Sequence, residues 1–472
     1  MTAESADDRP SAQEVLQQVT DVLRQHQQKL MSSHDAPSPQ ALDALLREGD
    51  LGALQTCLDG LHPADVAYIL EALPLDERLV VWDLVKAERD GEILLEVSDA
   101  VRETLIAHME NRELVAATEQ LDTDEIADLA PDLPQEVMQD VFRSLPLEER
   151  EQLRAAMSYP EDTVGALMDF DIISVREDVS VEVVLRYLRR LDEMPDHTDQ
   201  LFVVDRSEHL RGVLPVNRLL VTDLEVPVAS IMTGETFKLH PEAKAQDAAL
   251  AFERYDLVSA PVVDKDGKLV GRVTVNVVMD YIREESENEM LSAGGLREEE
   301  DLFASVWSSV KNRWAWLAIN LVTAFIASRV IGVFEDSIGK LVALAALMPI
   351  IAGIGGNSGN QTITMIVRAM ALGQITVSNA GKLFAKELGV SFINGLIWGA
   401  VVGLFAFLIY HSWQLGVVMT GAMLLNLLLA ALMGVTIPLV MQKLGRDPAM
   451  GSSVMITAIT DSGGFFIFLG LA

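Results

Sequence analysis

Five apolar stretches near the C-terminus, each long enough to cross a lipid bilayer, constrain this chain more than any other feature. A membrane-spanning helix needs about 20 mainly apolar residues. Only a His-Ser-Trp sequence separates the third stretch from the fourth, so these two are expected to form a tight hairpin. Residues 313–472 are therefore predicted to be an α-helical transmembrane domain of about five helices, at about 314–334, 339–367, 388–411, 414–442 and 448–472.

Acidic residues dominate the rest of the chain. The whole sequence has a net charge of −34, but residues from Arg313 onward hold 8 basic and 5 acidic side chains, which leaves −37 on residues 1–312. Such a charge disfavours nucleic acid as a partner and favours cations. The single cysteine, Cys57, permits no internal disulfide and fits a reducing cytoplasm. The first 40 residues lack the pattern of a cleaved signal peptide, so the acidic part is expected to stay in the cytoplasm.

Basic residues flank the apolar stretches mainly on one side; the first outer loop is the exception, with Arg329 and Lys340 but also Glu335 and Asp336. The loop near Ser412 has no Lys or Arg, whereas alternate ends of the stretches carry Lys311, Arg313, Arg368, Lys382, Lys386, Lys443 and Arg446. Because positive residues stay in the cytoplasm, the N-terminal side is expected inside and the C-terminus outside. This predicts a multi-pass protein of the cell (inner) membrane, in contact with membrane lipid.

Residues 39–159 show the pattern of an all-helical domain. A segment from Leu61 to Pro74 matches Leu121 to Pro134 at an offset of 60 residues, which predicts a superhelix of repeated helices; chance similarity of turns in an ordinary helical domain is the alternative. Several helices are expected to open at prolines, namely Pro63, Pro74, Pro134 and Pro146. Residues 1–38 are expected to be a mobile N-terminal segment, with one short amphipathic helix around Val15 to Leu23.

A second repeat fills residues 160–282. The segment beginning at Phe202 matches the one beginning at Pro261 at an offset of 59 residues. Each copy reads as strand, helix, strand, turn, strand and helix, so a small α+β module is used twice, at 160–222 and 223–282. This tandem resembles a pair of CBS domains.

The resemblance to CBS domains leaves two functions open. Such pairs often hold the ribose of an adenine nucleotide with a Thr and an Asp three residues later. Here Thr274 is followed by Val277, and the first copy has Pro215 and Arg218 instead. These departures count against a nucleotide at the CBS domains and favour a dimerising scaffold. Residues 283–312, rich in acids, are expected to form a connecting helix.

Two polar features interrupt the apolar half. Residues Pro349 to Gln361 combine Pro, Gly and amide side chains, which predicts unwound backbone along a water-filled path. Helix packing through Gly355 and Gly359 is the alternative, but it does not account for the amides. The second feature is Asp461, interpreted as the only carboxylate well inside a span.

A carboxylate at membrane depth usually marks an ion or proton path, although pairing with a neighbouring helix is the alternative for Asp461. Mg²⁺ keeps most of its water shell and needs only one or two carboxylates. No His or Cys lies near Asp461 in the sequence, which argues against zinc or copper. The pattern therefore favours hydrated magnesium.

The order of these segments resembles the MgtE family of magnesium channels over nearly the whole chain beyond residue 40. The segments Ser158 to Met168, Pro349 to Gln361 and Asp447 to Asp461 carry the resemblance. It implies a homodimer with a pore on the two-fold axis and Asp461 as the main selectivity residue. It also implies that Gly353 and Asn360 line the same site, and that cytoplasmic Mg²⁺ bound by the N-terminal and CBS domains closes the channel.

The chain departs from the family at its expected magnesium sensor. Asn276 and Val277 replace acids that the family usually supplies, and Asn288 stands within the acidic motif of the connecting helix. The carboxylates that remain as candidate sensor ligands are Asp280, Glu285, Glu287 and Glu289.

Two other classes of protein fit the apolar half less well. A proton- or sodium-coupled secondary transporter of another divalent cation or solute would require inverted repeats, and five spans do not divide into two equal sets. An intramembrane enzyme would require catalytic pairs that the spans lack, so no enzymatic activity is expected.

Overall fold

The computed structural model describes residues 12–32, 50–191, 194–296, 301–371, 374–375, 380–445, 448 and 451–472. The chain divides into two compact units. One comprises residues 1–284 with 300–304, and the other comprises residues 285–299 with 305–472. Each unit is described by itself.

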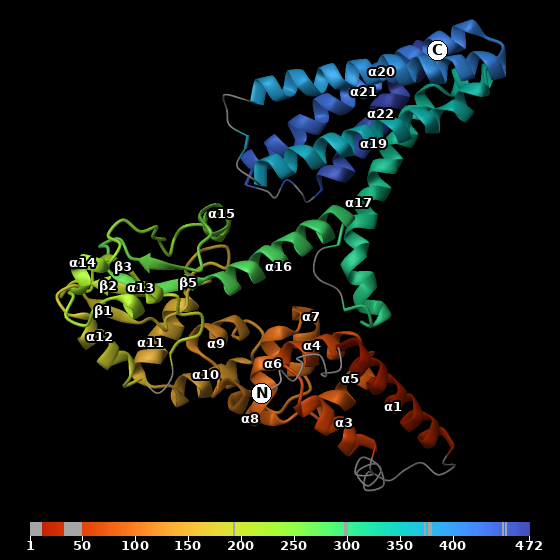
Figure 1. Ribbon diagram of the computed structural model, residues 1–472. Helices are drawn as coiled ribbons and strands as arrows, with labels where there is room; N and C mark the ends of the chain where they lie inside the picture. Colours follow the sequence, from red (N-terminus) through yellow and green to blue (C-terminus); the bar gives the residue numbers. More distant parts are fainter. Residues whose placement is uncertain are drawn as a thin grey trace, which may run out of the picture. The chain divides into compact units, whose positions relative to one another are not determined.

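The first unit begins with short helices around one apolar core (Figure 1). Proline opens α4 and caps three other helices, as the sequence predicts. The matching segments at the offset of 60 residues become α4 and α9. The helices are α1 (Ala12–Ser32), α3 (Asp50–Asp59), α4 (Pro63–Glu71), α5 (Leu75–Trp82), η1 (Ala87–Arg89), α6 (Asp90–Glu96), α7 (Asp99–Ile106), α8 (Asn111–Thr118), α9 (Thr123–Leu129), α10 (Gln135–Ser144) and α11 (Leu147–Ala156).

Helix α1 belongs to this core. Val15 and Val19 are fully buried and Leu23 is 3% exposed, because their spacing of four residues places them on one face. This face packs within the same core as the residues of α3 and α4. The prediction of a mobile segment over residues 1–38 is therefore wrong for residues 12–32, while the amphipathic helix is confirmed. The other residues of that segment lie outside the described ranges.

The two α+β modules repeat the same pairing of strands. Strand β1 pairs parallel with β2, β2 pairs antiparallel with β3, and β4 pairs antiparallel with β5. Leu239 bridges Val262 in parallel, at the place that β1 takes in the first module. The elements are β1 (Ser174–Arg176), α12 (Val181–Leu188), β2 (Gln200–Val204), β3 (Leu210–Pro215), α13 (Val216–Val221), α14 (Val228–Ile231), α15 (Ala245–Tyr255), β4 (Ser259–Val263), β5 (Leu269–Thr274) and α16 (Val275–Gly294).

The connecting helix differs from the prediction. Helix α16 runs through the expected boundary at residue 282 and ends at Gly294, since no proline or glycine interrupts residues 275–293. Gly295 follows with a φ of +81°, which favours glycine. The last residues of the predicted connector, 306–312, are the first turns of α17. Residues 283–312 are therefore not one independent helix.

A fully buried arginine fixes the end of the connector within the first unit. Arg78 of α5 donates to both carboxylate oxygens of Asp301, at 2.7 and 3.0 Å. Its Nε donates to the carbonyl of Leu70 at 2.8 Å, and Nη2 donates also to the carbonyl of Leu73 at 3.0 Å. The Arg78 side chain is 0% exposed and that of Asp301 is 6% exposed. Because the pair is buried, loss of either partner would leave an uncompensated buried charge and would strongly destabilise the folded domain.

The second unit is a bundle of long helices (Figure 1). Four of the described helical stretches, at 306–333, 381–410, 413–443 and 452–471, are long and apolar enough to cross a membrane. Helix α19 is equally long, but polar residues interrupt its apolar sequence. The helices are α17 (Val306–Val333), α18 (Glu335–Lys340), α19 (Ala343–Ala371), α20 (Ala380–Tyr410), α21 (Trp413–Lys443) and α22 (Ser452–Leu471).

Helices α20 and α21 form the expected hairpin. A Cβ atom at Gly399 would lie 2.9 Å from the carbonyl oxygen of Thr420, and one at Gly403 would lie 2.5 Å from that of Gly416. Glycines four residues apart therefore allow the two backbones to approach closely. Ser412 caps α21 by accepting from the Leu415 N–H at 3.4 Å.

Candidate functional site

The polar segment of the membrane half is helical throughout. Pro349 and all residues from Gly353 to Gln361 lie inside α19. The prediction of unwound backbone is therefore wrong. Amide and hydroxyl side chains lower helix propensity without breaking a helix, and here Thr364 donates back to the carbonyl of Asn360 at 2.9 Å.

Glycines of α19 place this segment directly against α22. A Cβ atom at Gly359 would lie 2.4 Å from Cγ1 of Ile456, and one at Gly356 would lie 3.7 Å from Oγ1 of Thr460. Asp461 follows Thr460, so its backbone lies near the level of Gly356. Both predicted partners lie within about one helical turn of that level, Gly353 before it and Asn360 after it.

A stripe of small and polar residues runs along α19 at helical spacing. Gly353, Asn357, Asn360 and Thr364 follow one another at intervals of four, three and four residues, which places them on one face. Within the single chain Asn360 is half-buried and the other three are exposed. Asn357 was missing from the predicted site, although the same spacing could have identified it.

Asp461 is half-buried in α22. Among the residues of the single chain that the structure describes, its carboxylate forms no ion pair. The hydroxyls of Thr457 and Thr460 donate to helix carbonyls at 2.8 Å. The buried hydroxyl of Ser462 has no hydrogen-bond partner in the described structure.

A second carboxylate lies within the helix bundle. Glu387 of α20 is 4% exposed, and its Oε2 lies 3.5 Å from the hydroxyl of Thr362. Lys386 lies 3.6 Å from its Oε1. Glu387 is thus a carboxylate within a helix long enough to cross a membrane, close to the start of that helix. The predicted span began one residue after Glu387, whereas α20 begins two turns earlier.

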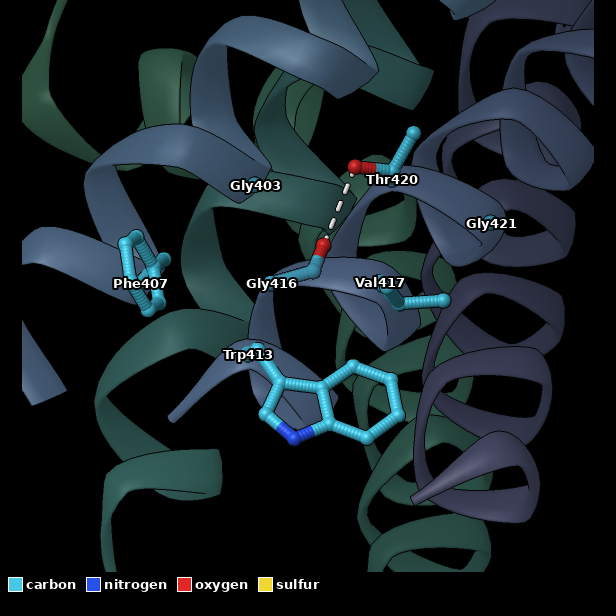
Figure 2. A pocket seen from close by; sticks show the side chains of 7 residues that line it. All are labelled: Gly403, Phe407, Trp413, Gly416, Val417, Thr420 and Gly421. Carbon is cyan, nitrogen blue, oxygen red and sulfur yellow. Dashed lines mark hydrogen bonds between the residues drawn. The ribbon is translucent and has the colours of Figure 1, made fainter. Parts of the chain in front are cut away.

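A pocket of about 500 Å³ lies between α20 and α21. Figure 2 shows the Thr420 hydroxyl directed at the carbonyl of Gly416, a hydrogen bond of 3.0 Å. No acidic residue lines this pocket, and none of its residues comes from α19 or α22. We therefore assign it no part in binding a cation. Its lining residues are Gly403, Phe407, Trp413, Gly416, Val417, Thr420 and Gly421.

The predicted sensor ligands do not converge. All four are exposed on α16, and Asp280 lies 3.7 Å from Arg283. Within the described ranges, no group of three or more His, Cys, Asp or Glu side chains is arranged to hold a metal ion. The ligands in question are Asp280, Glu285, Glu287 and Glu289.

Carboxylates of α9 gather where the helical domain meets the CBS pair. Burial and the negative charge of Asp169 raise the pKa of Asp124 to about 8. The pKa of Asp122 is raised by burial and by Asp169 and Asp196, which outweigh Arg272. Arg272 itself pairs with Asp169 at 2.7 Å. Sequence reasoning missed this cluster, because its members are far apart in the chain.

The residues at the expected nucleotide positions are held by the protein itself. Thr274 is 3% exposed at the end of β5. Arg218 donates to the carbonyl of Ile231 at 2.8 Å and to the hydroxyl of Thr233 at 3.4 Å.

The fold and the site together define a multidomain membrane protein with a helical domain, a CBS pair and a helix bundle that holds a half-buried carboxylate. Family models agree with this division. The model MgtE, a divalent cation transporter, matches residues 348–471, the MgtE intracellular N domain matches 61–162, and the CBS domain matches 164–223 and 228–284.

Full-length relatives cover nearly the whole chain. Magnesium transporter MgtE of Thermus thermophilus is 30% identical over 440 residues, which are 92% of this chain and 97% of that protein. Its namesake in Bacillus subtilis is 24% identical over 428 residues, 91% of this chain and 95% of that protein. A solved structure, the cytosolic domain of the Mg²⁺ channel MgtE in complex with ATP, covers 51% of this chain and 98% of its own at 32% identity and a TM-score of 0.46. The chain belongs to the MgtE family.

Proposed function

We propose that this protein is a magnesium-selective channel that carries Mg²⁺ across the cytoplasmic membrane into the cell. One observation carries the proposal: Asp461 of α22 lies near the same level along the bundle as the small and polar stripe of α19, because Gly356 packs near Thr460. The names of the full-length relatives support magnesium as the ion. A carboxylate and amides suit a cation that keeps its water shell.

The exposed stripe on α19 supports a homodimer. Asn357 would face lipid in a single chain, and polar side chains within a membrane usually face protein or water. A second copy related by a two-fold axis would cover the stripe and bring two Asp461 side chains to one path. In this arrangement the acidic half lies in the cytoplasm and the C-terminus lies outside.

Cytoplasmic Mg²⁺ would then act on the acidic half. Negative charges on Asp122, Asp124 and Asp169 together would repel one another across α9 and the CBS pair, and burial together with this cost raises the pKa values of Asp122 and Asp124. Hydrated Mg²⁺ between them would relieve this repulsion and favour a compact, closed state. When Mg²⁺ falls, the repulsion returns and the channel opens.

Flux into proteoliposomes tests the proposal. Purified protein should pass Mg²⁺ down its concentration gradient with no proton or sodium gradient present, and Mg²⁺ on the cytoplasmic side should reduce the flux. A requirement for a proton or sodium gradient would instead favour the coupled transporter.

A further inference from the structure

The centre of the helix bundle contains a fully buried amide. Asn426 of α21 is 0% exposed, and its Nδ2 donates to the carbonyl of Ile351 in α19 at 3.0 Å. It lies in an apolar cluster that includes Met423 and Leu427. Its Oδ1 has no hydrogen-bond partner within the described residues. An amide with one unsatisfied end destabilises such a core relative to an apolar side chain.

Two glycines make room for this amide. A Cβ atom at Gly355 of α19 would lie 2.2 Å from Nδ2 of Asn426, and one at Gly464 of α22 would lie 2.8 Å from the same atom. Neither glycine can gain a methyl group without moving the amide or a helix. Asn426 therefore lies between the backbones of α19 and α22 and contacts both.

The two contacts flank the candidate ion site. Ile351 and Gly355 lie two residues before and after Gly353, and Gly464 follows Asp461 by about one helical turn. Any change in the size or the hydrogen bond of residue 426 is therefore transmitted to both helices at the level of these two residues. Packing density in a protein core leaves little space to absorb such a change.

We propose that Asn426 is a positioning residue that sets the separation of α19 and α22, and through it the width of the ion path at Asp461. This inference rests on the proposed function. It accounts for an amide at a place where an apolar side chain would be more stable, because a hydrogen bond to a fixed carbonyl defines one distance between helices.

The test uses two substitutions, one in α21 at the amide itself and one in α19 at the glycine that makes room for it. Asn426→Leu removes the donor and adds volume, whereas Gly355→Ala keeps the donor and displaces it. Both variants are expected to lower the preference for Mg²⁺ over Ca²⁺ in proteoliposome flux by about tenfold, because displacements near 1 Å at a site have effects of that order or more. Flux is normalised to assembled protein.

Two matched controls separate positioning from packing. Thr420→Val also removes a donor from α21, but this hydroxyl donates to the carbonyl of Gly399 in α20 at 3.0 Å. Gly389→Ala also adds a methyl group to a helix, but nothing lies within 4 Å of its added Cβ. Both controls should keep the ion preference of the unmodified protein. Equal losses of preference in the controls and the two test variants would refute the positioning role.

A distance measurement keeps the inference separate from the proposed function. Spin labels at Ile350→Cys of α19 and Phe466→Cys of α22, in a Cys57→Ser background, report the separation of the helices directly. Gly355→Ala should lengthen this distance whether or not the unmodified protein passes Mg²⁺. Absence of Mg²⁺ flux through the unmodified protein would refute the proposed function but not the positioning role of Asn426. If Gly355→Ala changes neither the distance nor the ion preference, the inference is overturned. This holds even if Asn426→Leu fails to insert into the membrane, because Gly355→Ala tests the inference by itself.

Discussion

At the scale of a single residue, the proposed function predicts that permeation depends on the charge of Asp461. Replacing the carboxylate by an amide keeps its shape, so Asp461→Asn should insert and assemble normally. An ion pair at contact distance contributes about 1–4 kcal/mol in water-accessible surroundings. Flux of Mg²⁺ into proteoliposomes is therefore expected to fall by tenfold or more. Asp336→Asn, an exposed carboxylate in α18, is the matched control and should leave flux unchanged.

Amide side chains on α19 are expected to contact the water shell of the ion. Asn360→Ala removes hydrogen bonds worth about 1 kcal/mol each, so Mg²⁺ flux per assembled channel should fall roughly fivefold. Isotope flux and dimer content are measured on the same preparation. Unchanged flux per dimer, with fewer dimers, would assign Asn360 to packing instead.

At the scale of the element, the sequence predicted whether a segment is a helix or a strand better than it predicted where a helix begins, ends or is interrupted. The period of apolar residues identified the long helices and the two α+β modules, since burial repeats with the geometry of each element. The polar run of α19 was read as a break, because sequence alone does not show that Gly359 packs on Ile456. Asp461, Gly353 and Asn360 of the candidate site stay predictions from the sequence, whereas Glu387, Asn426 and Asp124 stand out only through contacts between distant segments.

Helix α9 should make the stability of the acidic half depend on pH. The pKa of Asp124 is raised from 3.8 to about 8, so between these values the folded state binds more protons than the unfolded state. Stability therefore decreases as pH rises from 6 to 8, by at most about 1.4 kcal/mol per pH unit for this group. Thermal unfolding of the full chain in magnesium-free buffer measures this decrease.

Magnesium provides the control for that pH dependence. A bound cation lowers the pKa of a nearby carboxyl, so saturating Mg²⁺ should flatten the dependence between pH 6 and 8. If the two pH profiles coincide, the carboxylates around Asp124 do not respond to the ion.

At the scale of the whole molecule, the family match and the acidic charge predict a switch in the acidic half. Limited proteolysis of the connector between residues 283 and 312 should slow as Mg²⁺ rises, in the millimolar range typical of weak carboxylate sites. Because Val277 and Asn288 supply no carboxylate to this region, protection is expected to require a high Mg²⁺ concentration. Cleavage that is indifferent to Mg²⁺, together with flux indifferent to it, would exclude the acidic half as sensor.

Arg78 connects the helical domain to the first helix of the membrane half, so it is placed to transmit such a switch. Only residues 302–305 separate Asp301, which Arg78 holds, from the start of α17 at Val306. Even fully extended, a link of this length spans less than about 20 Å. The Arg78–Asp301 pair therefore joins the helical domain to α17 through a short link of four residues, which limits how far one can move without the other. Arg78→Ala removes this attachment, so the variant channel should still conduct but no longer close in high cytoplasmic Mg²⁺. Flux measured at low and high Mg²⁺ tests this expectation.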